Sequence, residues 1–456
     1  MNGIWIGTLL ALAACHKDET PGPVTPPPTD STTRQYGTPY TEVPAPGNVV
    51  LYEVNFRAFS ASDNFAGVTA RLDSIRALGV NVLYLMPVYP VGVLKSINSP
   101  YCVKDYQGVS TEFGALADLR NLVAQAHTRH MAVLFDWVAD HTSWDNAWIA
   151  NKSWYQQDAG GNIISPPNTG WNDVAALNYT NQDMRQAMIK AMQYWVYTAN
   201  IDGYRCDAAD YIPFDFWQQA IDSLRNIPGH NLLLFAEGSR KDHFQAGFQL
   251  EYDMGYYYTV KDLFGAGRPV TIIDSLNGVE LAGIPAADRV VRYTTNHDVD
   301  LSDGTPLQLY GGKAGSLAAF VAASCMQGVP MLYNGQEIGC PVQLQYFNNS
   351  TPIDWTTSPD WGMEQQYKNV IALFNNSATL RGGTMTSYDS NDVCAFTKTS
   401  GDSTVLVLVN LRNAAVNYAL PSGLANTAWT DALAGGAINL GAQVSLGAYG
   451  YQVLTR

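Results

Sequence analysis

The stretch 131-MAVLFDWV-138 is a continuous run of apolar residues interrupted by one acid, Asp136. A run of this length without a polar face is typical of a strand that is buried on both sides, as in a parallel sheet. An acid inside such a run is costly to bury unless it has a partner or a task. The stretch therefore predicts a buried parallel strand, and it singles out Asp136 as a candidate functional residue.

The same pattern recurs along the chain up to about residue 380. The clear runs are 49-VVLYEVNFRAF-59, 80-VNVLYLMP-87, 131–138, 202-DGYRCDA-208, 231-NLLLFAEG-238, 289-RVVRYTTNHD-298 and 328-GVPMLYNGQE-337. One further run, 248-FQLEYDMGYYY-258, is weaker but falls in the correct gap. Amphipathic stretches such as 183-DMRQAMIKAMQYWVYTAN-200 lie between the runs. Eight strand and helix units over roughly 330 residues predict an α/β fold, a (β/α)8 TIM barrel.

The predicted barrel spans residues 48–380 and carries two additions. The third strand ends near Val138 and the next helix begins near Asn181, and a loop of that length without structure is unusual in a compact domain. Residues 139–180 therefore predict a small inserted subdomain. After Leu380, alternating runs such as 404-TVLVLVNL-411 are separated by turn residues. They predict a C-terminal antiparallel β-sandwich over residues 381–456.

The N-terminal segment predicts targeting rather than a folded domain. Residues 3–14 form an uncharged apolar run that is too short to span a bilayer, and 12-LAAC-15 resembles a bacterial lipoprotein cleavage box. We expect residues 1–15 to be a signal peptide with its lipidated Cys15, and the Pro/Thr-rich residues 16–47 to be an extended linker. The segment 16-HKDE-19 resembles a surface-export signal, which favours an outer-membrane lipoprotein of the cell envelope, displayed at the surface. A buried N-terminal segment is the alternative.

Composition excludes some partners and leaves others open. The chain has 456 residues and a formal net charge of −14, which argues against nucleic acid because phosphate binding needs a basic surface. Without Cys15, five cysteines remain and show no metal-type spacing. They are interpreted mainly as small buried residues, and a pair between Cys325 and Cys340 stays open, as does the oligomeric state.

Polar residues collect at the C-terminal ends of the predicted strands. They are Asp136, Arg205, Asp207, Glu237 and the triplet 296-NHD-298. An internal salt bridge, such as Arg205 with Asp207, would explain any one of them. Their occurrence on successive strands favours a catalytic site, because active sites of this barrel form at that face.

Four short motifs, taken in order, resemble those of glycoside hydrolase family 13, the α-amylase family. They are 136-DWVADH-141, 203-GYRCD-207, 235-FAEG-238 and 296-NHD-298, and the flanking stretches 99-SPYCVKDY-106, 176-ALNY-179 and 330-PMLYNGQEIG-339 match as well. The resemblance covers the chain from about residue 49 and is specific because each motif lies on its predicted strand. It implies an enzyme whose partner is an α-glucan: starch, glycogen or maltodextrins.

The resemblance implies a role for each matching residue. Asp207 matches the nucleophile, Glu237 the general acid/base and Asp298 the third acid, which holds the hydroxyls of the sugar. Arg205 would orient Asp207 and keep it ionised. The other matches, which would bind or surround the sugar, are Tyr101, Asp136, His141, Asn296 and His297.

Elementary chemistry agrees with these roles. Retaining hydrolysis needs two carboxyl groups about 5–5.5 Å apart and in opposite protonation states. Arg205 and Asp207 are two residues apart on a strand and share a face, and a neighbouring cation lowers the pKa of a carboxyl group. Glu237 follows the apolar run 232-LLLFA-236, and partial desolvation raises the pKa of an acid.

Departures from the family pattern bear on metal and specificity. Asp140 stands where the family often has an Asn that binds calcium, and an acid also offers oxygen, which a hard cation prefers. With Asp173 as a second ligand, Ca²⁺ is a candidate cofactor, and no organic cofactor is expected. Asp210 and Tyr211 replace a Lys that contacts the leaving sugar and a His, whereas Ala208 resembles α-1,4-acting members.

Taken together, the resemblance implies a retaining hydrolase of α-1,4-glucosidic bonds that forms a covalent glycosyl-enzyme intermediate. Two alternatives stay open: a transglycosylase or α-1,6-acting debranching enzyme with the same three acids, and a non-catalytic surface lipoprotein that binds glucan. The intact acids Asp207, Glu237 and Asp298 favour a catalyst. Tryptophans at positions 137, 144, 148 and 154 would either stack against sugars or pack inside the inserted subdomain.

Overall fold

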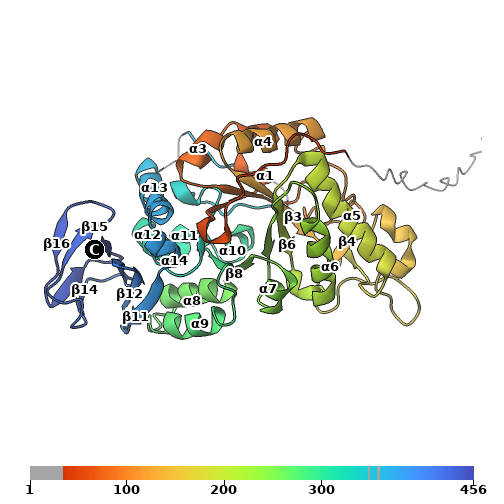
Figure 1. Cartoon of the computed structure of the whole chain (residues 1–456). Helices are drawn as coiled ribbons and strands as arrows, with labels where there is room; N and C mark the ends of the chain where they lie inside the picture. The colour runs from red at the N-terminus through yellow and green to blue at the C-terminus, as the bar shows by residue number, and fades with distance from the viewer. Residues whose placement is uncertain (1–33, 348–349, 357–359) are drawn as a thin grey trace, which may run out of the picture. The chain divides into compact units, whose positions relative to one another are not determined.

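The computed structural model describes residues 34–347, 350–356 and 360–456 (Figure 1). Eight strands close into a barrel in the order β1, β2, β3, β6, β7, β8, β9 and β10, and β10 pairs in parallel with β1. Their bounds are β1 Leu51–Val54, β2 Val82–Leu85, β3 Ala132–Val138, β6 Gly203–Asp207, β7 Leu233–Ala236, β8 Leu250–Tyr252, β9 Arg289–Arg292 and β10 Val329–Tyr333. The predicted (β/α)8 barrel is confirmed, and its weakest predicted strand forms β8.

The barrel strands have no solvent-exposed face. Every residue of β1, β2, β3 and β7 is buried, because side chains fill the interior and helices cover the outside. This double burial explains why the strands read as continuous apolar runs rather than as alternating ones.

Helices follow the strands and surround the barrel (Figure 1). The α-helices are α1 Phe56–Phe59, α2 Phe65–Thr69, α3 Leu72–Ala77, α4 Leu116–Thr128, α5 Gln182–Ala199, α6 Phe214–Arg225, α7 Asp242–Ala246, α8 Met254–Gly265, α9 Ile272–Glu280, α10 His297–Ser302, α11 Pro306–Leu309, α12 Lys313–Cys325, α13 Trp361–Asn376 and α14 Ala378–Gly382. The short 3-10 helices are η1 Pro46–Asn48, η2 Ala147–Ala150, η3 Lys152–Trp154, η4 Ala209–Tyr211 and η5 Gln336–Ile338. No helix among these residues is long and apolar enough to cross a bilayer.

The helix α5 shows how the sequence sets an element boundary. Asn181 caps its first turn by accepting the N–H of Met184 at 3.0 Å, and Asn200 ends it with a left-handed φ of 59°. Between the caps, Met188, Met192 and Trp195 recur at helical spacing and are buried. The cap at Asn181 therefore fixes both the start of α5 and the end of the inserted segment.

The inserted segment between β3 and α5 has little regular structure of its own. Its two strands, β4 His141–Ser143 and β5 Val174–Ala176, pair in antiparallel register. Between them Trp148 packs edge-on against Trp154, with ring centroids 5.3 Å apart, and against Tyr106 at 4.9 Å. Aromatic packing and this short ribbon therefore hold the segment on the barrel.

The C-terminal residues form two layers of antiparallel strands, as predicted. The larger sheet has the order β11 Thr384–Tyr388, β12 Val393–Ser400, β13 Ser403–Asn410, β18 Tyr451–Thr455, β15 Ala428–Asp431 and β16 Ala437–Asn439. The smaller sheet pairs β14 Val416–Ala419 with β17 Gln443–Leu446. Alternate residues of β13 serve two cores, since Val407 belongs to the core of the barrel and Leu408 to that of the sandwich.

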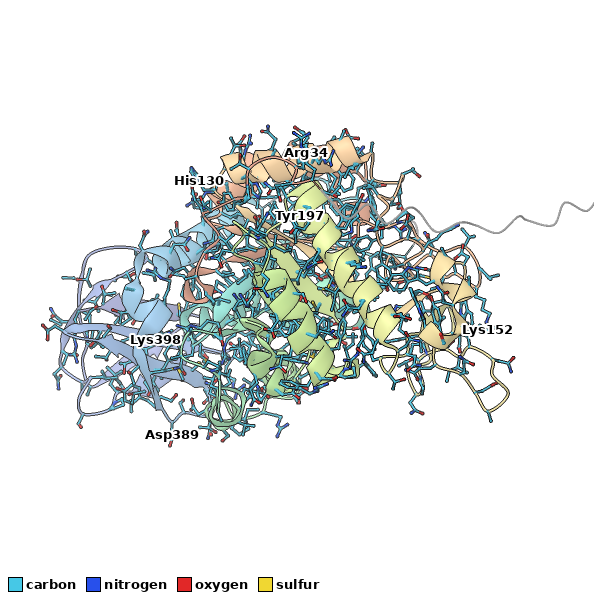
Figure 2. The ribbon with its side chains drawn as sticks, turned by 45° about the vertical axis from the view of Figure 1, so that its right-hand side comes forward. Arg34, His130, Lys152, Tyr197, Asp389 and Lys398 are labelled. Atoms are coloured by element: carbon cyan, nitrogen blue, oxygen red, sulfur yellow. The ribbon has the colours of Figure 1, made fainter. Side chains whose placement is uncertain are left out.

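One buried lysine joins this sheet to the barrel. Lys398 of β12, labelled in Figure 2, is 1% exposed and donates from Nζ to the carbonyl groups of Met326 and Leu380. Burial lowers the pKa of Lys398 to about 8. Its ammonium group therefore binds one carbonyl just after α12 and one carbonyl within α14.

Residues 35–47, which the sequence assigns to the linker, lie against the barrel helices. Tyr36 donates its backbone N–H to the carbonyl of Tyr197 at 2.7 Å, on the helix labelled in Figure 2. Tyr40 stacks on His127 with ring centroids 4.3 Å apart. The predicted signal peptide with Cys15, and the linker up to residue 33, lie outside the described residues. The other five cysteines are free, so Cys325 and Cys340 are not paired.

Candidate active site

Strand register brings the predicted site residues together at the C-terminal end of the barrel. Asp136 of β3 lies beside Arg205 of β6, and Val138 lies beside Asp207. On the next strand Ala236 pairs with Cys206, so Glu237 stands one residue beyond the end of β7. Arg205 and Asp207 point to the same face because they are two residues apart. The nucleophile and acid/base candidates therefore stand on adjacent strands.

Arg205 is the centre of this group and is fully buried. Its Nη1 lies 2.8 Å from Asp136 Oδ1 and 2.9 Å from Asp207 Oδ1, and its Nη2 lies 2.6 Å from Glu237 Oε1. The second oxygen of Glu237 accepts the N–H of Ala208 at 2.7 Å. Asp207 and Glu237 are 13% and 14% exposed, so both carboxyl groups reach solvent beside one shared guanidinium.

Asp136 is completely buried and receives two tyrosine hydroxyls as well as Arg205. Tyr84 donates to its Oδ2 at 2.7 Å and Tyr101 at 2.9 Å. Tyr101 was predicted to lie under the sugar, and it is only partly buried. Asp136 and Arg205 have no exposed surface, so the structure shows them in contact with protein groups alone.

The third acid, Asp298, lies in the first turn of α10 and is 46% exposed. Its Oδ1 accepts the hydroxyl of Tyr346 at 2.8 Å, and its Oδ2 lies 3.4 Å from Nε2 of His297. Asn296 caps the helix by accepting the N–H groups of Asp298 and Val299 at 3.1 and 2.9 Å. Asn296, a predicted sugar contact, thus also caps the helix that carries the acid.

His297 links the third acid to the rest of the site. Its Nδ1 is bonded to Glu53 of β1, and its Nε2 lies 2.7 Å from the hydroxyl of Tyr101. Although burial lowers the pKa of His297, the charges of Asp298 and Glu53 outweigh it and raise the pKa to about 9. His297 is therefore a cation at neutral pH, placed between two acids.

The two candidate catalytic acids, Asp207 and Glu237, both have raised pKa values. Burial raises the pKa of Asp207 well above its usual range, the charge of Glu237 adds to the rise, and Arg205 opposes it. Burial raises the pKa of Glu237 as expected, again against Arg205. Arg205 thus lowers the pKa of Asp207, as expected from the sequence, but burial and the charge of Glu237 outweigh it, and the net pKa is raised. Asp207 and Glu237 therefore titrate as a pair.

A second set of bonds ties the loop that carries Asp207 to the loop that carries Glu237. The carboxylate of Asp210 accepts the backbone N–H of Ser239 at 3.1 Å and that of Arg240 at 3.2 Å. In return, Arg240 Nη1 donates to the carbonyl groups of Asp210 and Ile212 at 3.0 and 2.9 Å. We call these reciprocal bonds the 210–240 clasp. The acid that replaces the Lys of the family is thus used to hold the loop of the acid/base.

His141 closes another side of the site, next to the predicted calcium ligands. Its Nδ1 lies 2.8 Å from Asp140 Oδ2 and its Nε2 lies 3.1 Å from the carbonyl of Tyr101. Burial lowers the pKa of His141, but Asp140 outweighs it and the net pKa is raised. Asp140 Oδ1 is buried and has no hydrogen-bond partner among the described residues, and Asp173 is near enough to act on the pKa of His141. The same residues contain no group of three His, Cys, Asp or Glu side chains arranged to hold a metal.

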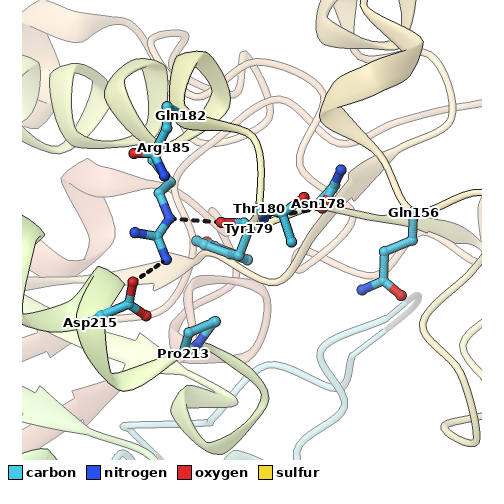
Figure 3. A pocket seen from close by; sticks show the side chains of 8 residues that line it. All are labelled: Gln156, Asn178, Tyr179, Thr180, Gln182, Arg185, Pro213 and Asp215. Atoms are coloured by element: carbon cyan, nitrogen blue, oxygen red, sulfur yellow. Dashed lines mark hydrogen bonds and ion pairs between the residues drawn. The ribbon is translucent and has the colours of Figure 1, made fainter.

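A pocket of about 670 Å³ lies where the inserted segment meets α5 and α6 (Figure 3). It is lined by Gln156, Asn178, Tyr179, Thr180, Gln182, Arg185, Pro213 and Asp215. Arg185 donates to Asp215 and to the carbonyl of Tyr179, both at 2.7 Å, and Thr180 donates to Asn178. Several of the lining groups are thus hydrogen-bonded to one another, and none of the lining residues is a predicted site residue. We therefore interpret the pocket as part of the packing between the inserted segment, α5 and α6.

Sequence reasoning missed three residues of the site. Glu53, which holds His297, is an acid inside the first apolar run and carried the same signal as Asp136. Tyr346, which binds Asp298, comes from a loop and carried no periodic signal. Trp171 packs edge-on against His141 with ring centroids 5.8 Å apart. Of the four tryptophans considered for stacking, Trp137 is fully buried and the pair in the insert packs internally, so packing is their main use.

A parallel (β/α)8 barrel with an acid pair on adjacent strands, a third acid and a shared arginine defines a glycoside hydrolase. The family model of the α-amylase catalytic domain matches residues 51–160 and 168–266 of this chain. The chain therefore resembles the α-amylase family in this part of the barrel as well as in its four motifs.

Known relatives agree with this placement. The chain is 28% identical to α-amylase MalA of Haloarcula japonica over 307 residues, which cover 64% of this chain and 44% of that protein. It is 24% identical to α-amylase 3 of Dictyoglomus thermophilum, over 72% of this chain and 71% of that one. The crystal structure of an α-amylase from Lactobacillus plantarum superposes with a TM-score of 0.81 at 25% identity, over 90% of this chain and 99% of that chain. The match thus spans less than half of the Haloarcula enzyme.

Proposed function

We propose that the protein is a retaining α-glucan hydrolase that cleaves α-1,4-glucosidic bonds of starch, glycogen or maltodextrins. The observation that carries the proposal is the pair Asp207 and Glu237, held side by side on one buried arginine and open to solvent. A site that only binds sugar gains nothing from two acids forced to share one cation. The named α-amylase relatives and the neutral, hydroxyl-rich nature of such substrates support the same class.

In the first step Asp207 attacks the anomeric carbon while Glu237 gives its proton to the glycosidic oxygen. A bond forms between the carbon and the Asp207 oxygen, and the bond to the leaving sugar breaks. In the second step Glu237, now a carboxylate, takes a proton from water as the water oxygen attacks the same carbon and frees Asp207. Glu237 becomes a carboxylate when it gives up its proton and is neutral again when it takes a proton from water. The charge next to Asp207 therefore changes at each step.

Asp298 and the cation His297 face the same sugar from the other side of the site. An exposed carboxylate such as Asp298 can accept sugar hydroxyls, and its bond from Tyr346 fixes its orientation. His297 is held by Glu53 and Tyr101, and its Nε2 lies 3.4 Å from Oδ2 of Asp298. These groups hold the sugar while its ring distorts toward the transition state.

The test is product analysis with amylose, pullulan and panose as substrates. The wild-type protein should release new reducing ends from amylose, whereas Asp207→Asn and Glu237→Gln should lose at least ~10²-fold in rate and keep glucan binding. Asp222→Asn, an exposed acid on α6, is the matched control and should retain activity. Redistribution of chain lengths without new reducing ends would show a transglycosylase, and preference for panose or pullulan would show an α-1,6-acting enzyme. Binding without any product would leave a glucan-binding lipoprotein.

We further propose that Asp140 and Asp173 help to hold a structural Ca²⁺. The unpartnered buried oxygen Asp140 Oδ1 supports this, although Asp140 Oδ2 is already used by His141 and further ligands would have to be carbonyl groups or water. No step of the reaction is routed through the ion. Removal of calcium by chelation should lower the thermal unfolding temperature, and Asp173→Asn should abolish that difference; an unchanged temperature would contradict the proposal.

We also propose that Cys15 carries a lipid and tethers the enzyme to the outer membrane. The resemblance of 12-LAAC-15 to a lipoprotein cleavage box supports the proposal. Detergent-phase partitioning of the full chain should be lost in Cys15→Ser. Unchanged partitioning of that variant would contradict the proposal.

A further inference from the structure

Two aromatic side chains stand exposed beside the site. Trp171 is 36% exposed and Tyr211 is 60% exposed, although large apolar side chains are normally buried. They come from different loops, one from the inserted segment and one from η4 after β6, yet their ring centroids lie 5.6 Å apart at an interplanar angle of 59°. Two loops thus bring two rings together without covering them.

The ring pair is continuous with the groups that surround the reacting sugar. Trp171 packs against His141, and the carbonyl of Tyr101 lies 3.1 Å from Nε2 of that histidine. Tyr211 follows Asp207 by four residues on the same loop. A sugar further along the bound chain than the two at the cleaved bond would therefore meet these two rings.

Both rings are held in place by bonds that do not use the rings themselves. The N–H of Trp171 is bonded to the Thr169 hydroxyl at 3.1 Å, and the following carbonyl, that of Asn172, accepts Trp144 Nε1 at 3.1 Å. Tyr211 lies between the two carbonyl groups that Arg240 holds in the 210–240 clasp. Rings that are fixed before binding lose little entropy when a ligand arrives.

The charge of the neighbourhood points to the same use. Asp210 stands where the family has a Lys for the leaving sugar, and its carboxylate is engaged by backbone N–H groups. This position supplies no cation for a sugar. Apolar C–H faces of a pyranose ring stack on aromatic rings, and an exposed ring pair provides that contact without charge.

We propose that Trp171 and Tyr211 form a stacking surface for a further sugar of the α-glucan chain, beyond the two sugars that are joined by the cleaved bond. The enzyme would then select chains of several sugars over short ones, because a short substrate leaves the surface empty. The inference rests on the proposed function and extends it from a bond type to a chain-length preference.

The first test compares kcat/KM for maltoheptaose and maltotriose. Trp171→Ala and Tyr211→Ala should each lower the value for maltoheptaose by about 10-fold, mainly through KM, and change that for maltotriose by less than about 3-fold. Trp171→Phe keeps a ring and should lie near wild type. Trp361→Ala, at an exposed tryptophan on α13, is the matched control. An equal fall for both substrates, or no fall for either, would overturn the inference.

The second test measures binding without turnover. Maltoheptaose should bind the inactive Glu237→Gln protein about 10-fold more tightly than the Glu237→Gln, Trp171→Ala double variant. Equal affinities of the two proteins for maltoheptaose would overturn the inference, because binding is measured here without any need for activity. Failure of the wild-type protein to cleave maltoheptaose at all would instead reject the proposed function. The two failures are therefore distinguishable.

Discussion

Two arginines on barrel strands are fully buried and differ in what their partners reach. Arg205 of β6 contacts three carboxyl groups, of which Asp207 and Glu237 are partly exposed. Arg292 of β9 lies 3.4 Å from Asp253, which is also fully buried, and donates to Asn277 at 2.6 Å. One cluster opens to solvent at the end of the barrel, and the other is closed.

The difference teaches that a charge inside an apolar run has two explanations that sequence alone does not separate. Arg292 also packs over the ring of Tyr256, at 4.3 Å from its centroid, and donates to the carbonyl of Gln327. Its partners hold two helices and a loop on the barrel, which is a structural use. Arg205 spends the same charge on acids that can meet a substrate. Both arginines are buried, so the candidate active site is distinguished by the solvent exposure of the carboxyl groups that Arg205 contacts.

The largest effect should follow from breaking the open cluster. Arg205→Met removes the cation from three carboxyl groups, so the pKa of Asp207 should rise further and leave the nucleophile protonated. We expect turnover of amylose to fall by ~10²-fold or more, since each pKa unit costs a factor of ten in the ionised fraction. Measurement of kcat over pH 5–9 checks this. A variant that keeps wild-type kcat at neutral pH would contradict the role given to Arg205.

The closed cluster should respond in stability instead. Arg292→Met leaves Asp253 as a buried charge without its cation, which typically costs about 3–5 kcal/mol. Urea denaturation should show that loss, while kcat of the folded fraction stays within about 2-fold of wild type. A fall in kcat comparable with that of Arg205→Met would erase the distinction between the two clusters.

Most of the fold was predictable because double burial leaves a strong signal in the sequence. β3 has seven buried residues in succession and was read directly, whereas β8 has only three, Leu250–Tyr252, and includes the buried Glu251. Glu251 lies 2.9 Å from Nδ1 of His243. The two residues are eight positions apart, and the alternation or run of apolar residues that identifies a strand does not predict such a contact. Short strands with internal charges are therefore the ones that periodicity describes poorly.

The acids of the site were predictable, and their electrostatics were not. Asp207, Glu237 and Asp298 each end an apolar run, so position made them candidates, and the family resemblance implied their roles. The pKa of Asp207 is raised because burial and the charge of Glu237 outweigh Arg205, and this balance depends on how the groups are placed in space. Tyr346 reaches Asp298 from 48 residues away along the chain, through a loop without periodicity. Such contacts follow from the closed fold rather than from local sequence.

Glu337 is a buried acid that should make the stability of the protein depend on pH, without taking part in the site. Glu337 accepts the hydroxyl of Tyr52 at 2.7 Å, and burial raises its pKa from 4.5 to about 7. Between those values the folded protein keeps a proton that the unfolded chain has released, so stability falls as pH rises from 4.5 to 7. Glu337→Gln should remove up to about 3 kcal/mol of that fall. Unfolding temperatures at pH 4 and pH 8 check it, and equal slopes for both proteins would contradict it.

The smallest effect should come from the 210–240 clasp, which touches the acids only through the backbone. Asp210→Ala removes the acceptor for the N–H groups of Ser239 and Arg240, so the loop after Glu237 should lose its fixed position. We expect kcat to fall about 10-fold with KM nearly unchanged, since a shift of the acid/base affects the transition state more than binding. Asp210→Asn keeps one acceptor oxygen and should restore part of the loss. Asp242→Asn, which removes a different partner of Arg240, is the control and should stay near wild type. A rise in KM without a fall in kcat would show that Asp210 meets the sugar itself, and the clasp would then belong with substrate binding rather than with the positioning of Glu237.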